Sequence, residues 1–257
     1  MGTILIGILS SIFYLLSSIY HPMSGHSKWK QIKYKKGAAD VKRGKIFSSL
    51  TKAITVASRT GQNLDMAVSR AKTANMPANN IERAIKKGTG ELNDGTTIEE
   101  LVYECYGPGG AAILISALTD NRNRTLAELK STLNKLGGRL AETGSVQYLF
   151  DRQGLIEVAL NPNRARDDVE LMLIEAGVDD IQAEDDRLSI IVSPSALMLT
   201  KKAIEQNGLS VLDTHLTNVA KMTITLSSDD EQKLIRLMEA IDELDDVESI
   251  ETNAELL

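Results

Sequence analysis

Eight cationic side chains lie within 18 residues of one another and could together bind phosphate groups. They are Lys28, Lys30, Lys33, Lys35, Lys36, Lys42, Arg43 and Lys45. Cations at successive positions neutralise successive phosphates and release condensed counterions, so binding of this kind weakens as the salt concentration rises. The chemistry that this spacing favours is electrostatic binding of a polyanion. The alternative is that the run is only a solvated surface.

The distribution of charge along the chain favours the polyanion. Residues 24–90 contain 15 Lys and Arg but three acids, whereas the rest of the 257-residue chain contains 14 Lys and Arg and 32 acids. The overall net charge of −6 conceals this asymmetry. A basic segment joined to acidic parts is typical of a polyanion-binding region attached to soluble modules.

The predicted nucleic-acid-binding residues extend beyond the first basic run. Lys28–Lys36 is expected to be an arm that becomes ordered on its partner. Trp29 has two interpretations: it stacks on an unpaired base, or it anchors the arm on the helices, which we favour. The full set is Lys28, Trp29, Lys30, Lys33, Lys35, Lys36, Lys42, Arg43, Lys45, Lys52, Arg59, Arg83, Lys86, Lys87, Arg122 and Arg124.

Other kinds of site find little support in the residue types. The three histidines, His21, His26 and His215, have no Cys or carboxylate at ligand spacing, so no metal is expected. The single Cys105 lies in an apolar stretch and is expected to be a small buried residue. We find no nucleophile with a base, no cofactor fingerprint and no paired carboxylates. The sequence therefore predicts a protein that is not an enzyme and has no cofactor.

Two glycine-containing segments resemble phosphate loops only superficially. Gly107–Gly110 and Gly88–Gly90 lack the Gly-Lys-Ser/Thr ending that a nucleotide cradle needs, so we interpret both as turns. Arg122 and Arg124 follow Asp120, a candidate helix cap. Cations in a first helical turn oppose the helix dipole. They are either kept for an outside partner or paired with acids of the neighbouring domain.

The first 22 residues contain an uncharged stretch, Thr3–Tyr20, close to the shortest length that spans a bilayer. It lacks the basic start of a secretory signal and the arginines of a mitochondrial presequence. A membrane anchor remains one interpretation. We favour another, that translation starts at Met23. Association with a membrane is then not expected.

Apolar spacing predicts three helices in the basic segment, over residues 40–61, 63–76 and 78–87. Asn63 is the expected cap of the second and Gly88 the expected end of the third. Lys45, Lys52 and Arg59 recur seven residues apart and are expected to face outward with Arg70, Lys72 and the cations of the third helix.

After residue 97 the pattern changes to alternating strands and helices. Strands are expected over 101–106, 111–118, 146–150, 155–160, near 180–184, over 188–192, near 209–212, and over 221–226 and 247–252. Helices are expected over 121–136, 166–176, 195–207 and 229–244. Residues 155–212 have the strand and helix order of a ferredoxin-like unit. The last two strands need a sheet to join, and the incomplete sheet of residues 101–150 is the nearest.

This order predicts an α+β protein. A small three-helix domain precedes two ferredoxin-like α/β domains, and the last is inserted in the middle one. The expected divisions are a hydrophobic extension over 1–22, a basic helical domain over 23–97, a discontinuous α/β domain formed by 98–151 plus 217–257, and an inserted ferredoxin-like domain over 152–216.

Four stretches resemble the YebC/PmpR family, which includes the mitochondrial translational activator of cytochrome c oxidase. They are Met23–Trp29 continued by Ile32, Lys33 and Asp40–Phe47; Ala74–Glu91; Tyr103–Thr125, with YGPGG and TDNRNRT; and Gly144–Phe150. The resemblance implies a helical domain followed by two α/β domains. Tyr34 departs from the family, which often has His there, and the hydrophobic extension has no counterpart in bacterial members.

The resemblance leaves two functions open, because family members are described both as ribosome-associated translation factors and as DNA-binding transcription regulators. We favour a translational activator that binds ribosomal RNA or tRNA, since the sequence has no evident base-reading motif. The alternative is a transcription regulator that binds promoter DNA. The expected location is the cytoplasm, or the mitochondrial matrix if the source is eukaryotic.

Overall fold

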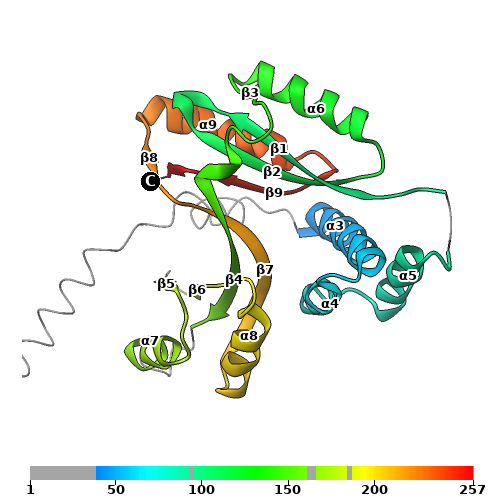
Figure 1. Cartoon of the computed structure of the whole chain (residues 1–257), viewed down its shortest axis with the longest axis vertical. Coiled ribbons are helices and arrows are strands. Elements are labelled where there is room, and N and C mark those ends of the chain that lie inside the picture. The colour runs from blue at the N-terminus through cyan, green and yellow to red at the C-terminus, as the bar shows by residue number, and fades with distance from the viewer. Residues whose placement is uncertain (1–38, 93–94, 161–165, 184–186, 257) are drawn as a thin grey trace, which may run out of the picture.

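The computed structural model describes residues 39–92, 95–160, 166–183 and 187–256, with side chains from Gly44 onward. It confirms the predicted fold class: three helices are followed by two antiparallel sheets that carry further helices (Figure 1). We call these parts the helical module, the first sheet and the second sheet. Among the described residues, no helix is both long and apolar enough to cross a bilayer. The stretch Thr3–Tyr20 lies outside that part of the chain.

The helical module consists of α3 (Ala39–Thr60), α4 (Leu64–Thr73) and α5 (Ala78–Thr89). Their apolar positions recur at three and four residues and meet in a small core that includes Leu50, Ile54, Ala67, Ala71, Met76, Ile81 and Ala84. The expected cap at Asn63 is wrong: this residue has a left-handed backbone, with φ 58°, and makes no side-chain cap hydrogen bond.

The expected end of α5 at Gly88 is also wrong. The helix continues to Thr89 and ends at Gly90, whose φ of 85° suits glycine. Gly88 instead lies where α5 crosses α3, and a Cβ there would be 2.4 Å from the carbonyl oxygen of Thr55. A close helix–helix approach, and not a turn, requires this glycine.

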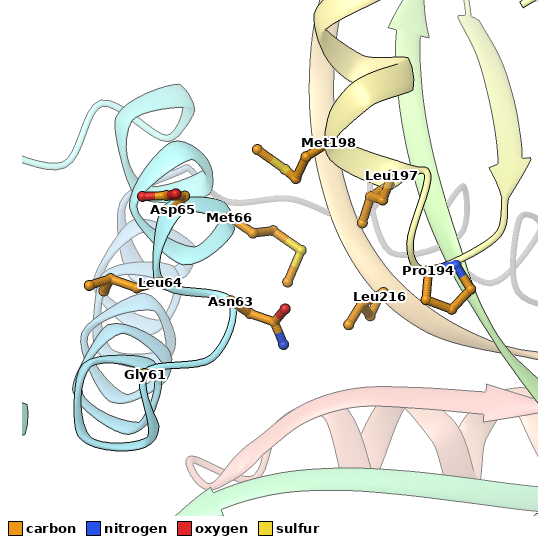
Figure 2. A pocket seen from close by; sticks show the side chains of 9 residues that line it. All are labelled: Gly61, Asn63, Leu64, Asp65, Met66, Pro194, Leu197, Met198 and Leu216. Carbon is orange, nitrogen blue, oxygen red and sulfur yellow. The ribbon is translucent and has the colours of Figure 1, made fainter.

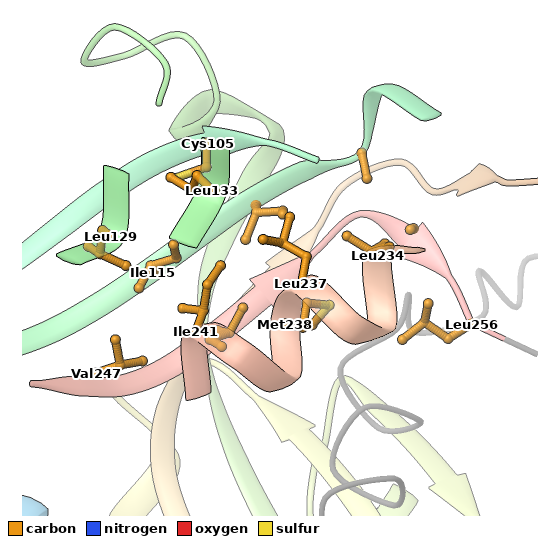
Figure 3. Close-up of a cluster of buried hydrophobic side chains, with 14 residues drawn as sticks. Cys105, Ile115, Leu129, Leu133, Leu234, Leu237, Met238, Ile241, Val247 and Leu256 are labelled. Carbon is orange, nitrogen blue, oxygen red and sulfur yellow. The ribbon is translucent and has the colours of Figure 1, made fainter. Parts of the chain in front are cut away.

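The first sheet has the strand order β3-β1-β2-β9, from Arg139–Leu140, Glu99–Tyr106, Ala112–Thr119 and Val247–Thr252. The turn between β1 and β2 is a short 3-10 helix at Pro108–Gly110, which confirms the turn interpretation of the YGPGG stretch. Helices α6 (Arg122–Lys135) and α9 (Ser228–Asp242) pack on this sheet. Their shared core contains Leu129, Leu133, Leu237, Ile241 and the fully buried Cys105 (Figure 3).

The second sheet has the order β5-β6-β4-β7, from Asp180–Ala183, Arg187–Val192, Phe150–Ala159 and Ser210–Ala220. All neighbouring strands are antiparallel, and α7 (Arg166–Glu175) and α8 (Leu197–Gln206) connect them in the ferredoxin-like order. The first sheet has a different strand order, because the two strands at its centre, β1 and β2, are consecutive in the chain.

Two predicted strands are wrong. Residues 147–149 form a 3-10 turn, and the chain enters β4 only at Phe150. Only Ile224–Thr225 of the predicted strand over 221–226 forms a strand, β8, which pairs in parallel with β10 (Ala254–Glu255) and does not join the first sheet. The expected partner strand over 247–252 does join that sheet, next to β2.

The helical module contacts both sheets. Val56 of α3 packs with Ile98 and Leu118 beside the first sheet. On the other side, α4 lies against β7, and Met66 reaches the core of the second sheet. Figure 2 shows Met66 pointing toward Leu197 and Leu216 across a cleft of about 250 Å³. This module therefore lies at the junction of the other two parts.

Candidate nucleic-acid interface

The structure describes half of the predicted binding side chains. Lys28, Trp29, Lys30, Lys33, Lys35 and Lys36 lie outside the described residues, and the side chains of Lys42 and Arg43 in α3 do as well. The described cations are Lys45, Lys52, Arg59, Arg83, Lys86, Lys87, Arg122 and Arg124. Arg59, Arg83, Lys86 and Arg122 are exposed, and we call them the exposed group. Lys52 and Arg124 contact acids beside the first sheet and form a second group. Lys87 is partly buried, and the ammonium nitrogen of Lys45 is buried, so the expected outward orientation of Lys45 is wrong.

The exposed group comes from three helices, α3, α5 and α6. Arg59 is in the last turn of α3, Arg83 and Lys86 lie on the outer side of α5, and Arg122 begins α6. The neighbouring positions Asn79 and Asn80 of α5 are also exposed, and Glu82 is the acid among them. A surface of this composition attracts phosphate and offers amide groups beside it.

Lys52 and Arg124 belong to the second group, because both donate to Asp246. Lys52 Nζ lies 2.8 Å from one carboxylate oxygen, and an Arg124 guanidinium nitrogen lies 2.7 Å from the other. The hydroxyls of Thr119 and Thr125 complete the site at 3.0 and 2.8 Å. The expected outward orientation of Lys52 is therefore wrong. Arg124 is thus paired with acids, but Asp120 and Asp246 belong to its own predicted domain and not to the neighbouring one.

The charge of this buried carboxylate depends on its donors. Burial alone would raise the pKa of Asp246, but hydrogen bonds from Lys52, Arg124 and Thr125 hold that pKa well below its ordinary value. The carboxyl side chain is only 2% exposed. Asp246 therefore remains an anion and joins α3 to the start of α6.

The TDNRNRT motif has a structural role that sequence reasoning missed. Asn121, and not Asp120, caps α6, because its side-chain oxygen accepts the backbone N–H of Arg124. Asp120 instead accepts from the Arg124 side chain at 3.0 Å. The motif thus positions one arginine on Asp246 and leaves the other, Arg122, exposed.

The stretch Gly144–Phe150 also has a structural role. Its backbone N–H groups at Gly144, Val146 and Gln147 donate to the carboxylate of Glu104 in β1. Burial would raise the pKa of Glu104, but these three donors lower it. An acid within an apolar strand was the signal for such a site in the sequence.

Arg70 is a further cation that faces inward, against expectation. It lies 3.3 Å from Asp213 of β7 and 3.5 Å from Glu248 of β9, so one side chain of α4 contacts both sheets. Burial would lower the pKa of Arg70, but the two carboxylates raise it. The structure thus separates paired cations from exposed ones within the same basic segment.

A cleft of about 390 Å³ lies between α3, the end of α5 and the start of α6, and its exposed lining is more apolar than polar. Lys52 of α3, Lys87 of α5 and Asp120 of the TDNRNRT motif are among its lining residues. The remaining lining residues are Phe47, Ser48, Thr51, Thr55, Thr96 and Ile98. The cleft beside Met66 has no Lys or Arg in its lining.

The described residues contain no group of three or more His, Cys, Asp and Glu able to hold a metal ion. Cys105 is buried, as expected, and burial together with Glu104 raises the pKa of its thiol to about 12. Its environment is that of an unreactive core residue.

Two family models match most of the chain. The model of the TACO1/YebC N-terminal domain matches residues 27–91, and the model of the second and third domains matches residues 98–254. The chain belongs to the TACO1/YebC family. The resemblance noted in the sequence is thereby confirmed.

Curated relatives and one solved structure agree. A probable transcriptional regulatory protein of Geobacter sulfurreducens is 41% identical to this chain. The alignment covers 91% of this chain and 96% of the relative. A probable transcriptional regulatory protein of Thermotoga maritima is 42% identical, and the alignment covers 91% of this chain and 94% of that protein. The crystal structure of a conserved hypothetical protein from Aquifex aeolicus is 40% identical, with a TM-score of 0.79 over 84% of this chain and 91% of that one. These relatives are bacterial and do not support the mitochondrial alternative.

Proposed function

We propose that this protein is a non-enzymatic regulator of gene expression that binds RNA on the ribosome and acts in translation. The observation that carries the proposal is the exposed cation group, which comes from α3, α5 and α6 and so spans the helical module and the first sheet. Exposed cations on several elements can contact phosphates at separate points of a folded RNA. The names of the relatives support gene regulation in general.

The proposal assigns a different role to each of the predicted domains. The basic helical domain, 23–97, binds the nucleic acid, and the discontinuous domain, 98–151 plus 217–257, with its inserted domain, 152–216, holds it in position. The contacts of Lys52 with Asp246, and of Arg70 with Asp213 and Glu248, support this division of roles. The proposed location is the cytoplasm, where ribosomal RNA and tRNA are available.

Crosslinking of the native protein in cells, followed by sequencing of the attached nucleic acid, tests the proposal. We expect ribosomal RNA or tRNA to be enriched, and the protein to sediment with ribosomes at low salt. Recovery of promoter DNA instead, with no protein in ribosome-containing fractions, would contradict translational control.

A second function, regulation of transcription through duplex DNA, is favoured by one structural feature. Helices α4 and α5 are joined by four residues, 74–77, as in a helix-turn-helix, and α5 exposes Asn79, Asn80 and Arg83. Asn and Arg are the side chains that read adenine and guanine in the major groove. Selection from random duplexes should then return a consensus that is lost in Asn80→Ala. A selection without a consensus would exclude this function.

A further inference from the structure

The cleft beside α3 combines a mostly apolar lining with two lysines, Lys52 and Lys87. Its floor is formed by the buried residues Thr55 and Ile98, while Ser48, Thr96 and Asp120 are exposed at its mouth. At about 390 Å³ it has the size of small-molecule sites in proteins.

Phe47 gives the cleft an aromatic wall. This side chain is half-buried: it packs on the core of the helical module and also lines the cleft. Every base has a flat face that stacks on an aromatic ring, so such a wall binds unpaired bases with little regard to sequence. Bases within a duplex are stacked on one another and are not available for this contact.

Two lysines provide the positive charge of the cleft. Lys52 donates to Asp246 and to the carbonyl oxygen of Asp245, and an ammonium has three N–H donors. Lys87 lines the cleft from the last turn of α5. Lys52 and Arg124 together balance the charges of Asp246 and of Asp120 on the wall, and Lys87 adds a further positive charge. The cleft can therefore accept a phosphate despite these acids.

We propose that the cleft holds one unpaired nucleotide of a single strand, with its base against Phe47 and its phosphate contacted by Lys52 and Lys87. The inference rests on the proposed binding of nucleic acid and adds a preference for single-stranded over duplex segments. The exposed cations outside the cleft bind both forms, because they contact only the phosphate backbone.

Binding of a short labelled single-stranded RNA, and of the duplex with the same sequence, tests this preference by fluorescence anisotropy with the full chain. Phe47→Leu keeps an apolar side chain in the core but removes the ring. We expect it to weaken single-strand binding about tenfold and to leave duplex binding unchanged, since stacking of one base on an aromatic ring contributes on this scale.

Lys87→Gln and Lys86→Gln form a matched pair, because the two neighbours differ in that only Lys87 lines the cleft. Lys87→Gln should weaken single-strand binding more than duplex binding, whereas Lys86→Gln should weaken both equally. Ser48→Gln lies on the surface of α3 and narrows the mouth of the cleft. If Phe47→Leu fails to unfold cooperatively, Ser48→Gln takes its place and should weaken single-strand binding more than duplex binding.

The outcomes separate the inference from the function on which it rests. Equal losses of affinity for single strand and duplex in Phe47→Leu, Lys87→Gln and Ser48→Gln would contradict the binding of a nucleotide in the cleft. The proposed binding of nucleic acid would remain. A wild-type protein that binds neither RNA would instead contradict the proposed function itself.

Discussion

Two buried carboxylates in the described part of the chain are each held by several donors. Asp246 accepts from two cations and two hydroxyls, and Glu104 accepts from three backbone N–H groups. Removing one partner from such a site leaves the others buried without their acceptor, which costs more than the original contact contributes. Both sites fix loops that the resemblance to the family had singled out.

Asp246→Asn should therefore destabilise the fold by roughly 2 kcal/mol at neutral pH, because Lys52 and Arg124 lose the anion between them. Urea unfolding followed by circular dichroism measures this difference. Asp245→Asn is the matched control: Asp245 is exposed, and it is its backbone oxygen that accepts from Lys52. If Asp245→Asn lowered the unfolding free energy as much as Asp246→Asn, the loss would come from a change in the loop and not from the Asp246 carboxylate.

The same substitution has a pH signature. Since folding lowers the pKa of Asp246, its carboxylate stabilises the folded state fully above the ordinary value of 3.8. That contribution is lost as the pH falls below this value toward the folded pKa. The difference in unfolding free energy between wild type and Asp246→Asn should narrow between pH 5 and pH 3. A constant difference over this range would contradict the assignment of charge to Asp246.

At the scale of elements, the packing of α5 on α3 depends on Gly88. Alanine in a helix is usually more favourable than glycine by about 1 kcal/mol. At Gly88, however, a Cβ would meet the oxygen of Thr55 at 2.4 Å and the Cβ of Ser58 at 2.7 Å. We expect Gly88→Ala to destabilise the protein by about 1–3 kcal/mol, because α5 must move away from α3.

Gly44→Ala is the control for Gly88→Ala. Gly44 also lies within a helix, α3, but a Cβ there meets nothing within 4 Å. It should raise the unfolding free energy by up to about 1 kcal/mol. Opposite signs for the two alanines in thermal unfolding would confirm the close approach, and equal signs would exclude it.

Apolar periodicity predicted the elements whose structure follows from their own sequence. It failed for segments whose structure depends on contacts with residues far away in the chain. The three basic helices and the strand over 247–252 follow from their own apolar patterns. Residues 146–150 contain a suitable apolar run, but Glu104 accepts the N–H groups of Val146 and Gln147, so the turn replaces a strand. Only two residues of 221–226 pair, and their partner is the end of the chain.

The same limit applies to the candidate site. Composition alone located the basic segment, but it could not divide paired from exposed cations. Lys52 meets an acid 194 residues away, and Arg70 meets acids 143 and 178 residues away. Spacing along the chain contains no information about such pairs. Arg59, Arg83 and Lys86 were expected to face outward, and they do.

At the scale of the whole molecule, Arg70 connects the helical module to both sheets. Its side chain is about three-quarters buried, so its pairs with Asp213 and Glu248 are shielded from solvent more than surface pairs are. Arg70→Gln should lower the unfolding free energy by roughly 1–2 kcal/mol and increase amide exchange in β7 and β9. Lys72→Gln, two residues along the same helix and exposed, should change neither. Unchanged exchange in Arg70→Gln would show that other contacts hold the modules together.

The division between paired and exposed cations also predicts how salt affects binding. The logarithm of the binding constant falls with the logarithm of salt concentration, with a slope set by the number of phosphates that the protein neutralises. Arg83 is exposed on α5, so Arg83→Gln should reduce that slope by about 1. Arg70 is paired with the carboxylates of Asp213 and Glu248 and not with phosphates. Arg70→Gln should therefore leave the slope unchanged, even if it weakens the contacts between the helical module and the two sheets. RNA titrations at several salt concentrations measure both values. A smaller slope in Arg70→Gln would mean that this arginine leaves its acids to bind RNA, and that the modules separate when the nucleic acid binds.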